Sequence, residues 1–238
     1  MTFQPQPNSQ GSLPGAYQVQ PSVTASPAFL TQAFTWMFAG LLLTAGIAAY
    51  VWSSQALLAF AANNILIVFL AQLGLVIAIS AGINRLGASA ALGLFFVYAA
   101  SLGLTVGLIV SLYTETSVAT AFLSASAMFG GAALYGATTK RSLAGIGATL
   151  TMGLFGLIVA IGVNLFLHNS TFSLIISVIG VVLFTVLTAW DVQRIQNGSL
   201  ALRTGSVEKA AVLGALALYL DFINLFLFLL RLLGSGRR

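Results

Sequence analysis

The sequence contains no cysteine and very little charge: nine Lys/Arg and four Asp/Glu among 238 residues, or 5% of the chain. Without cysteine the chain has no disulfide, no thiol nucleophile and no Cys-based metal site. A soluble globular chain carries roughly a quarter charged residues. So little charge cannot cover a water-soluble domain of this length. A soluble enzyme and a nucleic-acid-binding module are therefore excluded, although the isoelectric point is about 10.0.

Proline is absent after Pro27, and all five prolines lie in the first 27 residues among Gln, Ser, Asn and Gly. This part of the chain has no charged side chain and no helical apolar period. We predict that residues 1–28 form a disordered, water-exposed tail in front of a membrane domain at 29–238. The tail lacks the basic start and the compact apolar core of a secretory signal.

What the chain has instead is long apolar runs, since 59% of its residues are hydrophobic and its mean hydropathy is +1.02. About 20 apolar residues are needed for a helix to cross about 30 Å of hydrocarbon. The runs do not alternate with period two, as the strands of a membrane barrel do. We therefore expect an all-α polytopic membrane protein, a seven-helix transmembrane bundle in contact with lipid. The predicted spans are 31–52, 63–82, 88–110, 117–137, 144–167, 172–193 and 210–233.

The positive charges predict the orientation. A cytoplasmic N-terminus places six Lys/Arg in inner connections and none in the first, third and fifth connections, which the positive-inside rule favours. In a prokaryote the membrane would be the plasma (inner) membrane. Three arginines at or after the end of the seventh run conflict with this orientation, because a full crossing would place them outside. If the seventh run re-enters instead of crossing, they return to the cytoplasm, and both alternatives stay open. The six inner residues are Arg85, Lys140, Arg141, Arg194, Arg203 and Lys209, and the conflicting ones are Arg231, Arg237 and Arg238.

Asp221 is the charge that needs an explanation, because it lies in the middle of the last run with no other charge between Lys209 and Arg231. Eleven helical residues from Ala210 place it about 16 Å along the helix axis. An ionised carboxylate at that depth costs several kcal/mol unless it finds a partner, water or a proton. It is either a functional carboxylate in a polar pathway or a permanently protonated side chain that joins two helices.

Asp191 ends the sixth run and is the second acid inside an apolar run. By itself it predicts an interfacial i,i+3 ion pair with Arg194. If the sixth and seventh helices pack antiparallel, and the sixth continues past Asp191 or the seventh starts nearer Gly214, the two aspartates approach each other. Two close carboxylates in low dielectric share a proton, and when ionised they suit a hard cation such as Ca²⁺.

Three other polar residues have two interpretations each. Arg85 follows the second run and either latches the ionised pair or only sets the topology. Glu115 either stabilises a helix N-terminus, where negative charge is favourable, or recruits cations at the outer side. His168, the only histidine, lies in a connection without acidic neighbours, so we interpret it as an exposed loop residue rather than a metal ligand.

Small residues predict close helix packing. Gly103 and Gly107 form a G-x-x-x-G, and Ser126 with Gly130 a small-x-x-x-small pair. Catalysis is not indicated: no catalytic triad or nucleotide loop is present, and neither aspartate lies in the Gly-x-Gly-Asp of an intramembrane aspartyl protease. We expect no enzyme activity and no cofactor.

Several motifs resemble the Bax-inhibitor family, the transmembrane Bax inhibitor motif proteins, over about residues 30–233. The most specific is Leu218-Tyr219-Leu220-Asp221-Phe222-Ile223-Asn224-Leu225-Phe226, followed by Leu230-Arg231. The others are Trp190-Asp191-Val192-Gln193-Arg194-Ile195, Tyr135-Gly136-Ala137-Thr138-Thr139-Lys140-Arg141-Ser142-Leu143, Ser101-Leu102-Gly103-Leu104-Thr105, and Tyr113-Thr114 ahead of Ser117.

The resemblance implies a seven-helix bundle with a central last helix and a pH-sensitive Ca²⁺ leak. It also implies that Asp191 and Asp221 form a proton-sensing latch, and a candidate Ca²⁺ site, that Arg85 contacts. The expected function is a passive Ca²⁺ leak, with Ca²⁺ as the transported ion. The alternative is a non-conducting regulatory membrane protein that binds another membrane protein.

Overall fold

The computed structural model describes residues 27–236. Residues 1–26 of the predicted tail and Arg237 and Arg238 lie outside the described residues. The described chain is helical throughout, and seven of its helices are long and apolar enough to cross a membrane, so the predicted fold class is confirmed. The elements are α1 Pro27–Ser53, α2 Gln55–Asn63, α3 Ile65–Gly82, α4 Ala88–Val110, α5 Glu115–Thr138, η1 Ala144–Ile146, α6 Gly147–Leu167, α7 Ser170–Gln196, α8 Ser199–Thr204 and α9 Val207–Leu233.

The short helices α2 and α8 were not predicted, because neither carries a membrane-length apolar run. Helix α8 lies between Gly198 (φ 74°) and Gly205 (φ 64°), whose left-handed conformations suit glycine. The long helices extend beyond their apolar runs where a side chain caps them. Asn169 accepts a hydrogen bond from the Phe172 amide at the start of α7, and Ser206 caps α9 in the same way.

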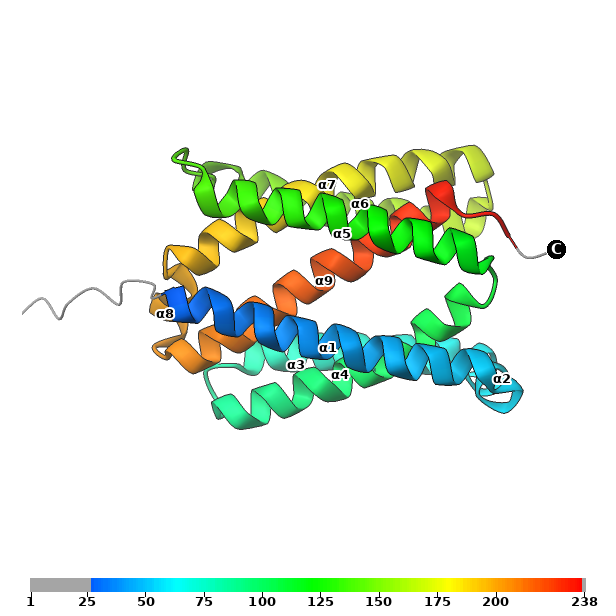
Figure 1. The fold of residues 1–238 in the computed structure, drawn as a ribbon, viewed down its shortest axis with the longest axis horizontal. Coiled ribbons are helices and arrows are strands. Elements are labelled where there is room, and N and C mark those ends of the chain that lie inside the picture. The colour runs from blue at the N-terminus through cyan, green and yellow to red at the C-terminus, as the bar shows by residue number, and fades with distance from the viewer. Residues whose placement is uncertain (1–26, 237–238) are drawn as a thin grey trace, which may run out of the picture.

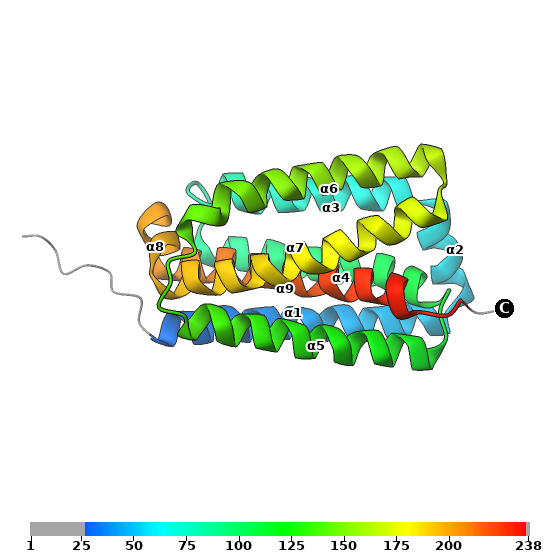
Figure 2. The same ribbon diagram turned by 90° about the horizontal axis from the view of Figure 1, so that it is seen from above.

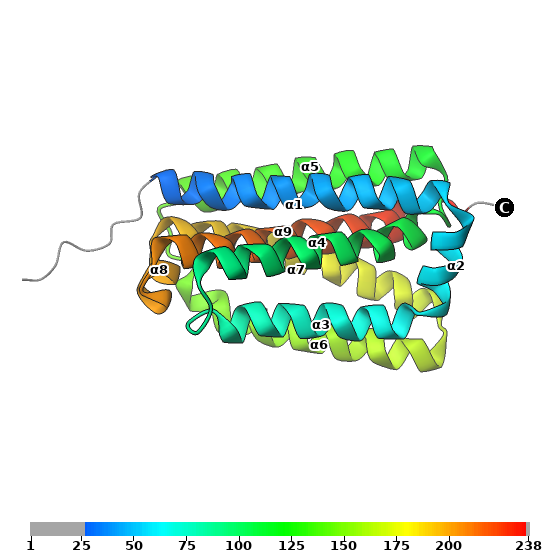
Figure 3. The ribbon, with the colours of Figure 1, turned by 90° about the horizontal axis from the view of Figure 1, so that it is seen from below.

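The seven long helices form three layers. Helices α4, α9 and α7 make the middle layer, with α1 and α5 on one side and α3 and α6 on the other (Figures 2 and 3). Helix α9 lies at the centre: 78% of its most apolar window is buried, against 11% in α3 and in α6. The implied central last helix is therefore present.

The two ends of the bundle differ in charge. The start of α1, the turn 83–87, the connection 139–143 and α8 lie at one end, called the α8 end, and α2 and the C-terminus lie at the other, the α2 end (Figure 1). All six lysines and arginines predicted on inner connections belong to the α8 end, and Arg231 belongs to the α2 end. This asymmetry is the one on which the prediction of a cytoplasmic N-terminus depends.

Helix α9 crosses the whole bundle as one uninterrupted helix from the α8 end to the α2 end (Figure 1). This continuous helix fits the alternative in which the seventh segment crosses and does not re-enter. The residues after α9 are held at the start of α5, because the Thr114 amide donates to the Ser235 carbonyl at 3.2 Å and the Ser235 amide donates to Ser117 Oγ at 2.9 Å.

Close packing of α1 on α4 confirms one of the two predicted small-residue pairs. A Cβ added at Gly103 would lie 2.7 Å from Ile47, and one at Gly107 would lie 2.9 Å from the Ala48 carbonyl oxygen. Nothing lies within 4 Å of a Cβ added at Gly130, so the Ser126–Gly130 pair is not matched by a close helix contact at Gly130.

A buried hydroxyl cluster joins α9 to this helix pair. The hydroxyl of Tyr219 lies 2.5 Å from Thr44 Oγ1, which lies 2.8 Å from the Ala99 carbonyl oxygen. Since Thr44 has one hydroxyl proton, a consistent chain has Tyr219 donating to Thr44 and Thr44 donating to Ala99. Three helices, α1, α4 and α9, are thereby connected two residues, or about half a helical turn, from Asp221.

Candidate functional site

The packing of α7 on α9 brings the two aspartates together. A Cβ at Gly214 would lie 3.0 Å from the Ile195 side chain, and one at Gly180 would lie 2.6 Å from the Phe228 ring. These two contacts define an antiparallel register in which Asp221 is opposite Thr188. Thr188 precedes Asp191 by three residues, about 4.5 Å along the axis, and the two carboxyl groups interact electrostatically.

The sequence predicts that the two aspartates approach each other if α7 continues past Asp191 or if α9 starts nearer Gly214. The first of these alternatives holds. Helix α7 continues past Asp191 to Gln196, whereas α9 begins at Val207, earlier than predicted. Asp191 therefore lies more than one turn inside the end of its helix, and the residue is 6% exposed. The roles of the two aspartates in proton sensing and Ca²⁺ binding remain predictions.

Asp221 is the more deeply buried of the pair, with 4% exposure. Its Oδ2 atom is the one buried side-chain oxygen or nitrogen of the described residues that makes no hydrogen bond. Thr188 on α7 is the hydroxyl that interacts with this carboxyl, and it also donates to the Phe184 carbonyl at 2.8 Å, so Oδ2 itself is left without a partner. A buried carboxyl oxygen without a donor is costly unless a proton, water or cation reaches it.

Asp191 has a partner of its own. Its Oδ1 lies 3.5 Å from Nη1 of Arg194, whose guanidinium carbon is 4.9 Å from the centre of the Trp190 ring. The predicted i,i+3 ion pair is therefore present. Asp191 lies between a cation on its own helix and the carboxyl of Asp221.

Arg85 is not at this site. It lies in the exposed turn between α3 and α4 and forms no ion pair with any residue from 29 to 236. The arginine beside the pair is Arg194, the residue that the three-residue spacing from Asp191 predicted as its ion-pair partner. The α3–α4 turn is instead attached to the start of α9, where Lys209 Nζ donates to the Asn84 carbonyl at 3.3 Å. The latch role implied for Arg85 stays a prediction.

A cavity of about 220 Å³ leads from the α8 end toward the pair. Arg194 and Arg203 line it, as does Ser80 of α3, and its apolar wall is one face of α9. That wall ends at Leu220, the residue before Asp221. The α9 residues that line it are Leu213, Leu216, Ala217 and Leu220.

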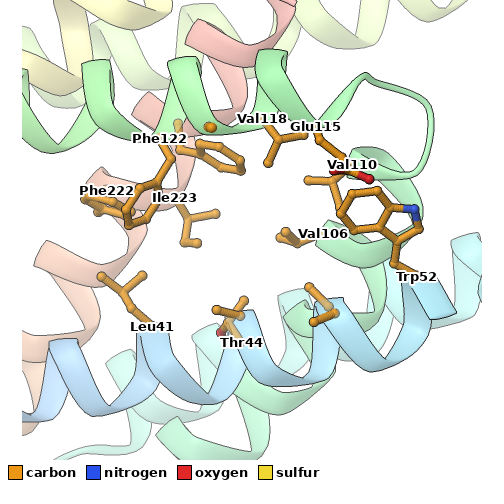
Figure 4. A pocket seen from close by; sticks show the side chains of 15 residues that line it. Leu41, Thr44, Trp52, Val106, Val110, Glu115, Val118, Phe122, Phe222 and Ile223 are labelled. Carbon is orange, nitrogen blue, oxygen red and sulfur yellow. The ribbon is translucent and has the colours of Figure 1, made fainter. Parts of the chain in front are cut away.

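A larger cavity of about 590 Å³ lies on another face of α9, between α1, α4 and α5 (Figure 4). Phe222 and Ile223, which directly follow Asp221, line its deep end. At 3.6 residues per turn, Leu220 and Phe222 point about 200° apart around the helix. Asp221 is therefore in the part of α9 that separates the two cavities.

The remaining predicted residues lie at the α2 end. Glu115 is the first residue of α5, after the Thr114 cap, and it also lines the larger cavity. His168 ends α6 with a left-handed backbone (φ 49°) and is exposed. No group of three potential metal-ligating side chains occurs in the described part of the chain.

Comparison with known proteins gives a consistent family. The family model described as inhibitor of apoptosis-promoting Bax1 matches residues 26–238. The inner membrane protein YbhL of Escherichia coli K12 is 42% identical over 215 residues, covering 88% of this chain and 92% of YbhL. An uncharacterized protein of Deinococcus radiodurans is 43% identical over 210 residues, with 88% and 90% covered. One of Borreliella burgdorferi is 41% identical over 214 residues, with 88% and 92% covered.

Proposed function

This chain belongs to the family of inhibitors of apoptosis-promoting Bax1, and from that premise we propose that it is a passive, pH-sensitive Ca²⁺ leak of the inner membrane, gated at Asp191 and Asp221. The observation that carries the proposal is the buried Oδ2 of Asp221, which has no hydrogen-bond partner and belongs to the residue that follows the end of the smaller cavity.

The pair has the chemistry that the proposal needs. Carboxylate oxygens are the preferred ligands of Ca²⁺, and acids within membrane spans are characteristic of ion and proton pathways. The smaller cavity gives an approach from the α8 end that stops at Leu220, one residue before Asp221. The cavity does not continue past that point, as expected of a closed state.

Gating follows from competition for the carboxylates. Arg194 holds the position at Asp191 that the family resemblance implies for Arg85. With the pair ionised, the positive charge of Arg194 offsets the repulsion between the two carboxylates and keeps α7 and α9 in the closed arrangement. Protonation weakens the contact between Asp191 and Arg194 and shifts the population toward an open bundle. Calcium then passes down its gradient, and no cofactor takes part.

The test is Ca²⁺ flux into proteoliposomes across roughly pH 6 to 8, the range in which a coupled acid pair can titrate. The wild type should leak more at the lower pH, and Asp221→Asn should abolish this dependence. Glu208→Gln is the matched control, because it removes the same charge from the same helix but at an exposed position in its first turn. Unchanged flux and pH dependence in Asp221→Asn would overturn the proposal.

The second candidate is a regulatory membrane protein that conducts nothing and binds another membrane protein. The long apolar faces of α3 and α6, where only 11% of the span is buried, offer the area for such a contact. Purified protein without flux at any pH, together with one stoichiometric membrane partner captured by crosslinking in cells, would favour this candidate.

A further inference from the structure

The larger cavity is not suited to a hydrated cation. Its walls are apolar or aromatic except at Thr44 and Glu115. Thr44 is buried, and its hydroxyl is engaged by Tyr219 and Ala99. A cavity with so few polar groups and a volume of about 590 Å³ is in the range of sites that bind apolar ligands, about 300–1,000 Å³.

The cavity opens sideways, between α1 and α5. These helices touch near the α8 end, where the Phe34 and Phe129 rings are 6.4 Å apart in an edge contact. Toward the α2 end the cavity separates them, and α9 forms its floor (Figures 1 and 4). Ala45 and Ala119 line the cavity and are exposed, and Phe122 is 50% exposed. In a membrane, the medium at this opening is lipid.

The depth of the cavity matches one leaflet. Along α1 it extends from Trp52 at the α2 end to Leu41, eleven residues or about 16 Å of helix axis. The hydrocarbon core is about 30 Å thick, so one leaflet contributes about 15 Å. An acyl chain that lies parallel to α1 therefore fits the cavity from its α2 end, at Trp52, to its deep end, at Phe222 (Figure 4).

The residues at the α2 end of the cavity indicate which lipid headgroup it binds. Glu115 is the only ionisable side chain of the lining, and it lies beside Trp52 at the α2 end (Figure 4). Tryptophan is typical of the membrane interface, the level of lipid headgroups. A carboxylate at that level attracts an ammonium group and repels a headgroup with net negative charge.

We propose that this cavity binds one acyl chain of an amine-headed phospholipid from the leaflet at the α2 end, with the ammonium group at Glu115. The site lies on another face of α9 from the cavity that approaches the aspartate pair, and it does not depend on the proposed leak. The lipid fills the space between α1 and α5 and completes the packing around α9.

The experiment is native mass spectrometry of the whole protein released from nanodiscs that contain equal amounts of phosphatidylethanolamine and phosphatidylglycerol with identical acyl chains. The wild type should keep one phosphatidylethanolamine after annular lipid has been stripped. Ala45→Phe/Ala119→Phe, which places two rings in the cavity, should lower the retained fraction at least about tenfold. The control Gly46→Phe/Thr120→Phe adds the same rings one residue further along each helix, where a Cβ at Gly46 meets nothing within 4 Å.

Glu115→Gln tests the headgroup without filling the cavity. It should keep one lipid but lower the preference for phosphatidylethanolamine over phosphatidylglycerol about threefold, as expected for a half-exposed ion pair. The proposal is overturned by a wild type that keeps no lipid, or by equal retention in the filling and control variants. A lipid-free dimer would overturn it too, because a second copy would then cover the opening.

Discussion

Helices α9 and α3 are similarly apolar but have opposite surroundings. Their mean hydropathies are 2.1 and 2.5, yet 78% of the α9 window is buried and only 11% of the α3 window. The difference follows from their polar residues. Helix α9 carries Asp221 and Tyr219, which need protein on several sides, whereas the one polar contact of α3 toward the bundle is Gln72, which donates to the Ser101 carbonyl and to Thr105 of α4. Hydropathy therefore decides that both helices lie in the membrane, and the positions of their polar side chains decide which of the two lies at the centre of the bundle.

The largest expected effect compares leucines of these two helices. Leu218→Ala in α9 removes a side chain that is 0% exposed and should lower the free energy of unfolding by about 2–5 kcal/mol through the cavity it leaves. Leu66→Ala in α3, where the leucine is 66% exposed, should cost almost nothing because lipid fills the space. SDS-induced unfolding followed by circular dichroism measures both. Equal losses would mean that α3 is covered by protein, not lipid.

A smaller effect compares glycines of α7 and α6. Gly180→Leu places a side chain against the Phe228 ring of α9 and should cost about 1–3 kcal/mol. Gly156→Leu in α6 is the control, since nothing lies within 4 Å of its added Cβ, and it should be neutral or slightly stabilising. The same unfolding assay applies. If Gly180→Leu is also neutral, the α7–α9 register that opposes Asp221 to Thr188 is wrong.

The smallest effect compares two arginines. Arg194→Gln removes the cation 3.5 Å from Asp191, so the pair should become protonated at higher pH. The midpoint of the pH-dependent flux should rise by roughly 0.1–0.7 pH units, the equivalent of about 0.2–1 kcal/mol for an ion pair whose arginine still reaches solvent. Arg85→Gln, in the turn after α3, should leave the midpoint unchanged. A shift in Arg85→Gln alone would assign the latch to Arg85, as the family resemblance implies.

Much of the architecture could be predicted because each span needs an apolar run of the same length. The third predicted span, 88–110, coincides with α4, and the others differ from their helices by a few residues at the ends. The differences arise where caps such as Asn169 and Ser206 extend a helix beyond its apolar run. Helix α8 could not be predicted in this way, because its ends depend on two left-handed glycines and not on hydropathy.

The candidate site was predicted in part. Asp221 and Asp191 stood out because acids are rare in apolar runs, and the register of α7 on α9 places them near each other. Arg194 had a visible signal, its spacing from Asp191. The partnerless Oδ2 of Asp221 had none, since it depends on how the helices around Asp221 pack.

By itself, the sequence determined the solvent, the number of spans and the residues whose burial needs a reason, because the cost of placing charge in hydrocarbon depends on the residue and its depth. Only the tertiary structure decided which helix is central and that an apolar cavity one leaflet deep opens between α1 and α5. These depend on contacts between side chains more than a hundred residues apart, such as Thr44 with Tyr219, which no local pattern contains.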